Sequence, residues 1–164
     1  MARTKSKHSK KPNFAGIPRY VMDTKAYKSL GGNAVKLLMC VAYQFKGKNN
    51  GDLLITHSFL KGYFKSNQTM YNARDELEKK GFIAINVYGG MSYGGYKRPT
   101  LYALTWLTIN DFRDLEKNTY LYSHLPIDKE PLKYFIDGNN PNYKNTNQKE
   151  AQFKKDIKKA NVEY

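Results

Sequence analysis

The feature that most constrains the fold is a helix, its stop signal and a following strand, all within residues 66–90, SNQTMYNARDELEKKGFIAINVYGG. Apolar residues recur at helical spacing on one face of residues 67–80: Met70, Ala73 and Leu77. This spacing predicts a helix with that face in a core. Gly81 is typical of a helix end, and the alternation of Phe82, Ala84 or Ile85, and Val87 after it favours a strand.

The outward face of this helix is polar but uncharged over its first turns. Its members are Asn67, Gln68, Tyr71 and Asn72. A solvated helix face usually carries Glu and Lys four residues apart, whereas Asn and Gln can each form two hydrogen bonds with an adenine edge. Ser66, the expected N-cap, and Thr69 can donate to phosphates near the positive helix end. An ordinary solvated face of an Asn-rich chain is the alternative.

The charge of the chain is strongly positive and unevenly distributed. It has 28 Lys and Arg against 14 Asp and Glu, a net charge of +14 and a pI near 9.7. Residues 1–12 hold five bases and no acid, residues 13–110 hold 13 bases and 5 acids, and residues 111–164 hold 10 and 9. The surplus predicts a polyanionic partner, such as nucleic acid, an anionic membrane surface or an acidic protein. We expect its site in the first two thirds.

Cysteine and hydropathy patterns indicate the compartment. Cys40 is the single cysteine, which excludes a disulfide within the chain and fits a reducing environment. No run approaches the ~18 apolar residues of a membrane span, and the basic N-terminus lacks the apolar centre of a signal peptide. We expect a cytoplasmic, nucleoid-associated bacterial protein without membrane contact.

Nothing in the sequence favours catalysis or a cofactor. The three histidines, His8, His57 and His124, lie far apart and share no metal-ligand spacing with Cys40. No Ser/His/Asp arrangement and no pair of carboxylates at a defensible spacing is present. We therefore expect no enzyme activity, no metal and no cofactor.

The order of the predicted elements is helix, strand, helix, helix, strand, hairpin, strand, an α+β arrangement. It is the order of a winged helix-turn-helix, in which three helices and a small antiparallel sheet carry a wing. The supporting helix would be His57–Phe64, the recognition helix Asn67–Lys80 and the wing Gly89–Pro99. Four cations are candidate backbone contacts around the recognition helix: Lys61, Lys65, Lys97 and Arg98.

Three segments follow from this interpretation. Residues 1–12 are a disordered basic arm, and Arg3 and Lys5 within it are candidates for an adjacent minor groove. Residues 13–110 are the winged-helix domain. Residues 111–164 are a C-terminal extension, partly helical or disordered, with helices expected at 127–136 and 149–159 and a candidate role in homodimer contact.

Two sets of residues resemble known families. Thr69-Met70, Ala73, Leu77-Glu78 and Lys80-Gly81-Phe82-Ile83 resemble the signature of bacterial winged-helix regulators. The pieces Asn49-Asn50-Gly51-Asp52 and Tyr102-Ala103-Leu104-Thr105-Trp106 resemble small winged-helix proteins of bacterial mobile elements and phage. The resemblance implies double-stranded DNA binding in transcription regulation, replication initiation or plasmid transfer. Arg74 departs from it, since an apolar residue is common there.

Two other functions fit the same residues. A winged-helix scaffold with a basic surface can serve as a protein-interaction module for an acidic partner. Exposed aromatic residues among cations can instead bind single-stranded nucleic acid by stacking, and Tyr63, Tyr71, Tyr93 and Tyr96 are the candidates. We expect most other aromatic side chains to lie in the core.

Overall fold

The computed structural model describes residues 14–91, 95–110 and 123–160. The helices are α1 (Arg19–Met22), α2 (Lys25–Lys28), α3 (Gly32–Gln44), α4 (Asn67–Lys79) and α5 (Thr146–Ala160). The strands are β1 (Leu53–Leu54), β2 (Ile83–Val87), β3 (Gly90–Met91), β4 (Lys97–Arg98) and β5 (Leu101–Leu104). This mixture of helices with small antiparallel sheets is the α+β class that the sequence predicts.

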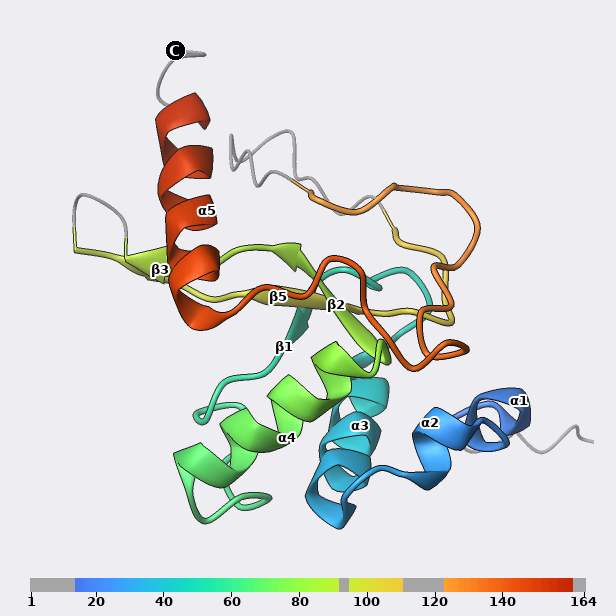
Figure 1. The fold of residues 1–164 in the computed structure, drawn as a ribbon. Coiled ribbons are helices and arrows are strands. Elements are labelled where there is room, and N and C mark those ends of the chain that lie inside the picture. The colour runs from blue at the N-terminus through green and yellow to red at the C-terminus, as the bar shows by residue number, and fades with distance from the viewer. Residues whose placement is uncertain (1–13, 92–94, 111–122, 161–164) are drawn as a thin grey trace, which may run out of the picture.

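A three-stranded sheet lies between two layers of chain (Figure 1). Its strand order is β1-β5-β2, all pairs are antiparallel, and Leu53 and Ile83 pair with Tyr102 and Leu104 of the central strand β5. Helices α3 and α4 lie on one side of the sheet, and the C-terminal segment with α5 lies on the other. Strands β3 and β4 form a separate two-stranded hairpin that extends from β2 and β5.

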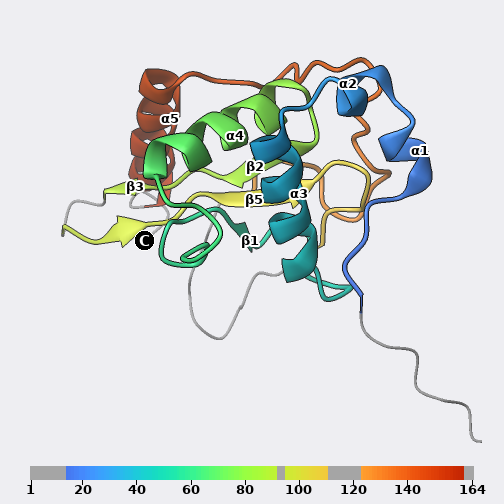
Figure 2. The same ribbon diagram turned by 90° about the horizontal axis from the view of Figure 1, so that it is seen from below.

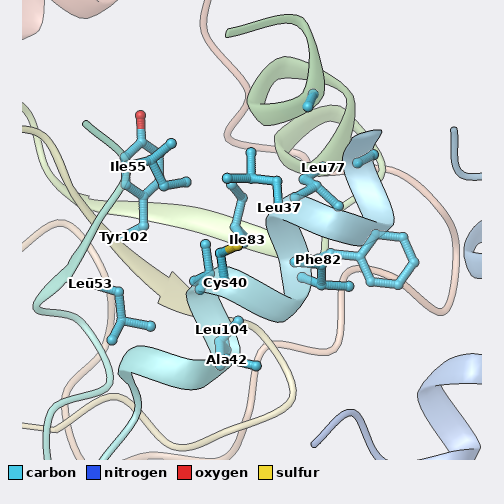
Figure 3. Packing of buried hydrophobic residues seen from close by; sticks show 14 of the residues in the cluster. Leu37, Cys40, Ala42, Leu53, Ile55, Leu77, Phe82, Ile83, Tyr102 and Leu104 are labelled. Atoms are coloured by element: carbon cyan, nitrogen blue, oxygen red, sulfur yellow. The ribbon is translucent and has the colours of Figure 1, made fainter. Parts of the chain in front are cut away.

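The main core lies between α3, α4 and the sheet (Figure 3). Leu37 from α3, Leu77 from α4 and Ile83 from β2 are fully buried and meet there. Burial of each such side chain stabilises the fold by roughly 1.5–3 kcal/mol. The inward stripe predicted for α4 is confirmed, since Met70, Ala73 and Leu77 are all buried.

The second face of the sheet is also covered. All five residues of β2 and all four of β5 are buried, although a sheet open to water on one face would alternate buried and exposed residues. Ala84 and Ala103 form a second cluster with Ile109 and with residues of the C-terminal third: Leu125, Leu132 and Tyr134. This layer explains why every residue of β2 is buried, including the polar residue Asn86.

Phe135 joins the C-terminal segment to the main core. Its ring is fully buried and stacks on Phe82, with ring centroids 5.8 Å apart. Trp106 and Tyr20 contact the same ring, at centroid distances of 6.4 and 6.2 Å. A side chain far along the sequence is therefore a central member of the core.

The buried side chain of Asn50 forms hydrogen bonds that join the loop after α3 to β5 and to the residues that follow β5. The Nδ2 group of Asn50 donates to the carbonyl oxygens of Leu104, Leu107 and Thr108 at 3.0–3.1 Å, and its Oδ1 accepts from the Leu104 N–H at 2.7 Å. Asn86, at the bulge in β2, donates to the carbonyl of Gly51. Thus the NNGD and YALTW pieces are hydrogen-bonded to each other.

Two predicted helices are absent from the described residues. Residues 57–64 form turns, because Gly62 adopts a φ of +92° that interrupts helical geometry. The expected three-helix core therefore lacks its supporting helix. Residues 127–136 also form turns, since Asp128 and Lys133 have φ of +52° and Pro131 lacks an N–H donor. The expected tail helix at 149–159 is present as the longer α5.

Candidate nucleic-acid interface

The N-terminal half of α4 presents the polar row predicted from the sequence. Asn67, Gln68, Tyr71 and Asn72 are all exposed, and Thr69 is partly exposed beside them. Ser66 occupies the N-cap position, as predicted, but its side chain makes no capping hydrogen bond. The first turn of α4 therefore combines outward amides with a hydroxyl that is not used as a cap.

Two members of the row are joined by a hydrogen bond. The Nε2 of Gln68 donates to the Oδ1 of Asn72 at 2.8 Å, one helical turn away. The bond uses one hydrogen of Gln68 and one lone pair of Asn72. It leaves the Nδ2 donor of Asn72 and the Oε1 acceptor of Gln68 without a hydrogen bond inside the described part of the protein. Because each amide restrains the other, the pair offers a donor and an acceptor with little freedom left to lose on binding.

Arg74 and Tyr71 form a second pair on the same helix. The guanidinium of Arg74 lies over the Tyr71 ring, 5.0 Å from its centroid. Arg74 is partly buried, and its Nε has no hydrogen-bond partner within the described part of the chain. Arg74, which interrupts the apolar stripe of α4, therefore packs its guanidinium against the face of the Tyr71 ring, where a cation is favoured. This contact restrains the Tyr71 side chain.

The acids that follow the row on α4 are all partnered. Asp75 accepts from the Tyr143 hydroxyl at 3.0 Å and lies 3.4 Å from the Lys79 ammonium. Glu76 accepts from Lys80 at 2.9 Å and from the Gly31 N–H, at the start of α3. Burial alone raises the pKa of Glu76, but these hydrogen bonds hold it below its ordinary value. The negative charges of Asp75 and Glu76 are therefore partly neutralised by Lys79 and Lys80.

Glu78 lies inside the protein. It is 1% exposed and forms an ion pair with Lys149 of α5 at 2.7 Å. Burial raises the pKa of Glu78 even though Lys149 opposes that shift. This carboxylate therefore belongs to the contact between α4 and α5, and its charge does not face the polar row.

A shallow hollow borders the row on its α3 side. It has a volume of about 320 Å³ and lies between the start of α3 and the outward side of α4. The lining residues are Gly31, Gly32, Asn33, Thr69, Asn72, Ala73 and Glu76. Asn33 was not predicted as a site residue, and only its place beside Asn72 in the folded chain marks it. The hollow extends the polar surface beyond α4.

Cations stand at the N-terminal end of the row and on the hairpin. Lys61 and Lys65 are exposed in the turns before α4, and Lys97 and Arg98 are exposed on β4. The N-terminal end of α4 and the β3–β4 hairpin lie at the same side of the molecule in two perpendicular views (Figures 1 and 2). The fold therefore gathers the predicted residues of 61–72 and 97–98 on one side.

The remaining predicted contacts lie outside the described residues. Arg3 and Lys5 belong to residues 1–13, and Tyr93 belongs to residues 92–94. Among the described aromatic residues, Phe59 joins Tyr63 and Tyr71 as an exposed ring near Lys61 and Lys65, with exposures of 49%, 51% and 40%. No local pattern separates Phe59 from the aromatic residues that were expected in the core.

Comparisons with family models, with curated protein sequences and with solved structures gave no significant match. Within the described residues, no helix has the length and apolar character needed to cross a bilayer. No three His, Cys, Asp or Glu side chains among these residues gather as metal ligands would.

Proposed function

We propose that this protein binds double-stranded DNA as a winged helix-turn-helix, with α4 in the major groove and the β3–β4 hairpin against the backbone. The biological role that we propose is that of a transcription regulator, or of a replication or transfer accessory factor of a mobile element. This role rests on the sequence resemblance, whereas the mode of binding rests on the surface chemistry of α4.

The observation that carries the proposal is the exposed amide pair on α4. The hydrogen bond between Gln68 and Asn72 leaves the Nδ2 donor of Asn72 and the Oε1 acceptor of Gln68 available on one exposed face. An adenine edge in the major groove offers the matching acceptor N7 and donor N6. We therefore assign adenine recognition to Gln68 and Asn72 acting together, with Asn67 and Tyr71 as the neighbouring base contacts.

The arrangement of elements supports the winged-helix interpretation. Along the chain, α4 leads directly into β2, which is followed by the β3–β4 hairpin and then by β5, and this order supports the proposal. Although residues 57–64 are not helical, Leu60 and Phe64 are buried in the main core, immediately before α4 begins. This segment can thus hold the start of α4 in place, which is the role of a supporting helix.

The cations around α4 are assigned to the phosphate backbone. Lys61, Lys65, Ser66 and Thr69 lie near the positive end of α4, where phosphates are favoured. Lys97 and Arg98 provide the wing contacts, and Arg3 and Lys5 of the N-terminal arm are proposed for the minor groove. Hydroxyl and ammonium contacts position the protein, whereas the amides select the sequence.

A gel-shift titration with mixed-sequence duplex tests the proposal. With six to ten phosphate contacts, affinity is expected to fall roughly 10³–10⁵-fold between ~50 and ~200 mM salt. The double variant K97Q/R98Q should weaken this binding and lower the salt slope. The matched variant K25Q/K28Q, which removes the same charge from α2 on the far side, should retain the wild-type slope.

The outcomes of this titration separate the candidate functions. Absence of duplex retardation at low salt, where nonspecific binding is strongest, would reject the proposal and favour an acidic protein partner. Equal slopes for the two double variants would reject the wing as a DNA contact.

One observation favours a second function, the binding of single strands. Phe59, Tyr63 and Tyr71 are exposed rings interleaved with Lys61 and Lys65, and such sets stack on unpaired bases. If this is the activity, single strands will bind more tightly than duplex of the same length. The variant Y63A will then weaken single-strand binding, whereas on the duplex proposal it changes little.

A further inference from the structure

Helix α5 divides into two faces of different chemistry. One face is turned to the body of the protein and carries residues at helical spacing: Lys149, Gln152, Phe153, Asp156 and Ile157. The opposite face carries four exposed lysines: Lys154, Lys155, Lys158 and Lys159. The nearly balanced charge of residues 111–164 conceals this separation. Residues 111–137 hold four bases and six acids, and residues 138–164 hold six bases and three acids.

The inward face fixes α5 beside the hairpin. Phe153 is 4% exposed and lies against β3 so closely that a Cβ atom added at Gly90 would be 2.5 Å from its ring. Lys149 is paired with buried Glu78 at 2.7 Å, and Asp156 Oδ2 lies 2.8 Å from His124 Nε2. A helix anchored at three successive turns holds its outward face in a defined direction.

The four lysines form two like-charged pairs, and no ion pair within the described residues offsets the repulsion in either pair. Lys154 and Lys158, and likewise Lys155 and Lys159, are four residues apart, and each such pair destabilises a helix by roughly 0.2–0.5 kcal/mol. Lys158 and Lys159 gain from the negative end of the helix dipole, but Lys154 and Lys155 stand before the last turn. Among the described residues, no ion pair involves any of the four.

Helix α5 lies at the same end of the molecule as the proposed DNA contacts, on the other side of the sheet from α4 (Figure 1). In both perpendicular views α5, the β3–β4 hairpin and the N-terminal end of α4 lie at the same side of the molecule (Figures 1 and 2). Exposed Lys97 and Arg98 of β4 continue the cationic surface on the hairpin. A helix of this length spans about 22 Å, the rise of about six base pairs.

We propose that the lysine face of α5 is a second backbone-contact surface, which binds phosphates of the duplex beyond the wing. This inference rests on the proposed function. Lysines act as point charges toward phosphate and read no bases, so this surface lengthens the footprint without adding sequence preference. A second copy of the same face is a poor partner, because the like charges repel.

The test compares two variants of equal charge in the full-length chain. The variant K154Q/K155Q/K158Q/K159Q removes the four charges of the lysine face of α5. The variant K25Q/K28Q/K46Q/K48Q removes four exposed lysines from α2 and from the loop after α3. Glutamine keeps helix propensity, and circular dichroism checks that both variants fold. Duplex binding is measured against salt concentration, and the bound length is measured by footprinting.

The expected result is specific to α5. The slope of log affinity against log salt should become shallower by about 1 for each lysine that contacts phosphate, and protection should retract at one edge only. Equal slopes and equal footprints for the two variants, with wild-type binding intact, would overturn the α5 inference alone. Absence of wild-type duplex binding would overturn the proposed function and this inference with it.

Discussion

The loop at Asn49–Gly51 and the first turns of α4 use the same side-chain amide chemistry at opposite exposure. Asn50 is fully buried and forms hydrogen bonds with the backbone of the segment 104–108. Gln68 and Asn72 are exposed and bond to each other. Buried amides need partners because unsatisfied polar groups are costly, whereas exposed amides are free to exchange water for a ligand.

In this Asn-rich chain, burial separates two roles of the side-chain amide. The residue type alone does not separate a structural amide from a recognition amide. The NNGD and YALTW pieces, which carry much of the family resemblance, are the two sides of one internal connection through Asn50 and Leu104. These two pieces therefore serve the interior of the protein, and their resemblance to other sequences carries no information on the outward residues of α4.

The largest effect is expected for N50A. It removes the partners of three carbonyl groups and of the Leu104 N–H in the interior. The free energy of unfolding should fall by about 3–4 kcal/mol, measured by urea denaturation. The control is N139A at an exposed asparagine, for which the change should stay within about 0.5 kcal/mol. Similar losses for both would contradict the structural role of Asn50.

N86A tests whether the second buried amide supports the same loop. It leaves the Gly51 carbonyl and the Ser123 hydroxyl without the partner they have at Asn86. The expected loss of unfolding free energy is about 1–3 kcal/mol, in the same denaturation experiment. The DNA affinity of the folded protein should not change. A loss of DNA binding without a loss of stability would show that Asn86 acts in DNA recognition and not in the structure of the loop.

N72A probes the exposed region. Binding to the cognate site, identified by selection from random duplexes, should weaken by about 1–3 kcal/mol, with little change on random DNA. Stability should change by less than about 0.5 kcal/mol, so the pattern is the reverse of that for N50A. Equal losses of affinity on cognate and random duplexes would reject Asn72 as a sequence reader.

The smallest effect is expected for Q68A on stability. Removal of the Gln68–Asn72 hydrogen bond should lower the free energy of unfolding by about 0.2–0.5 kcal/mol. Its effect on cognate binding should not add to that of N72A, because the two amides act as a pair. A double-mutant cycle measures this coupling, and strict additivity would show that the residues read the DNA separately.

The sequence predicted the α+β class and the α4–β2 junction because those features depend on local patterns. Helical spacing of Met70, Ala73 and Leu77 and the stop at Gly81 need no distant partner to be recognised. Gly81 has a φ of +78°, which explains why the helix ends there. The outward row followed directly, since the positions opposite a buried stripe must face away from the core.

The contributions of the C-terminal third were not predictable in this way. Phe135 stands in the stretch 127–136 that was expected to be helical, and its place against Phe82 depends on a contact between segments far apart in the chain. The turns at 57–64 were expected to be helical because their apolar residues fit either structure, and the backbone angle of Gly62 decides between them. The lysine face of α5 emerges only when Phe153 defines the direction of the helix.

The covering of both faces of the sheet has a practical consequence for shortened forms of this protein. A fragment that ends at residue 110 would uncover the Ala84 and Ala103 side of the sheet and remove the ring that stacks on Phe82. Newly wetted apolar patches of this kind promote aggregation. A shortened form made to test DNA binding therefore requires residues 123–160 to be retained, even though the polar row of α4 lies entirely within the first half of the chain.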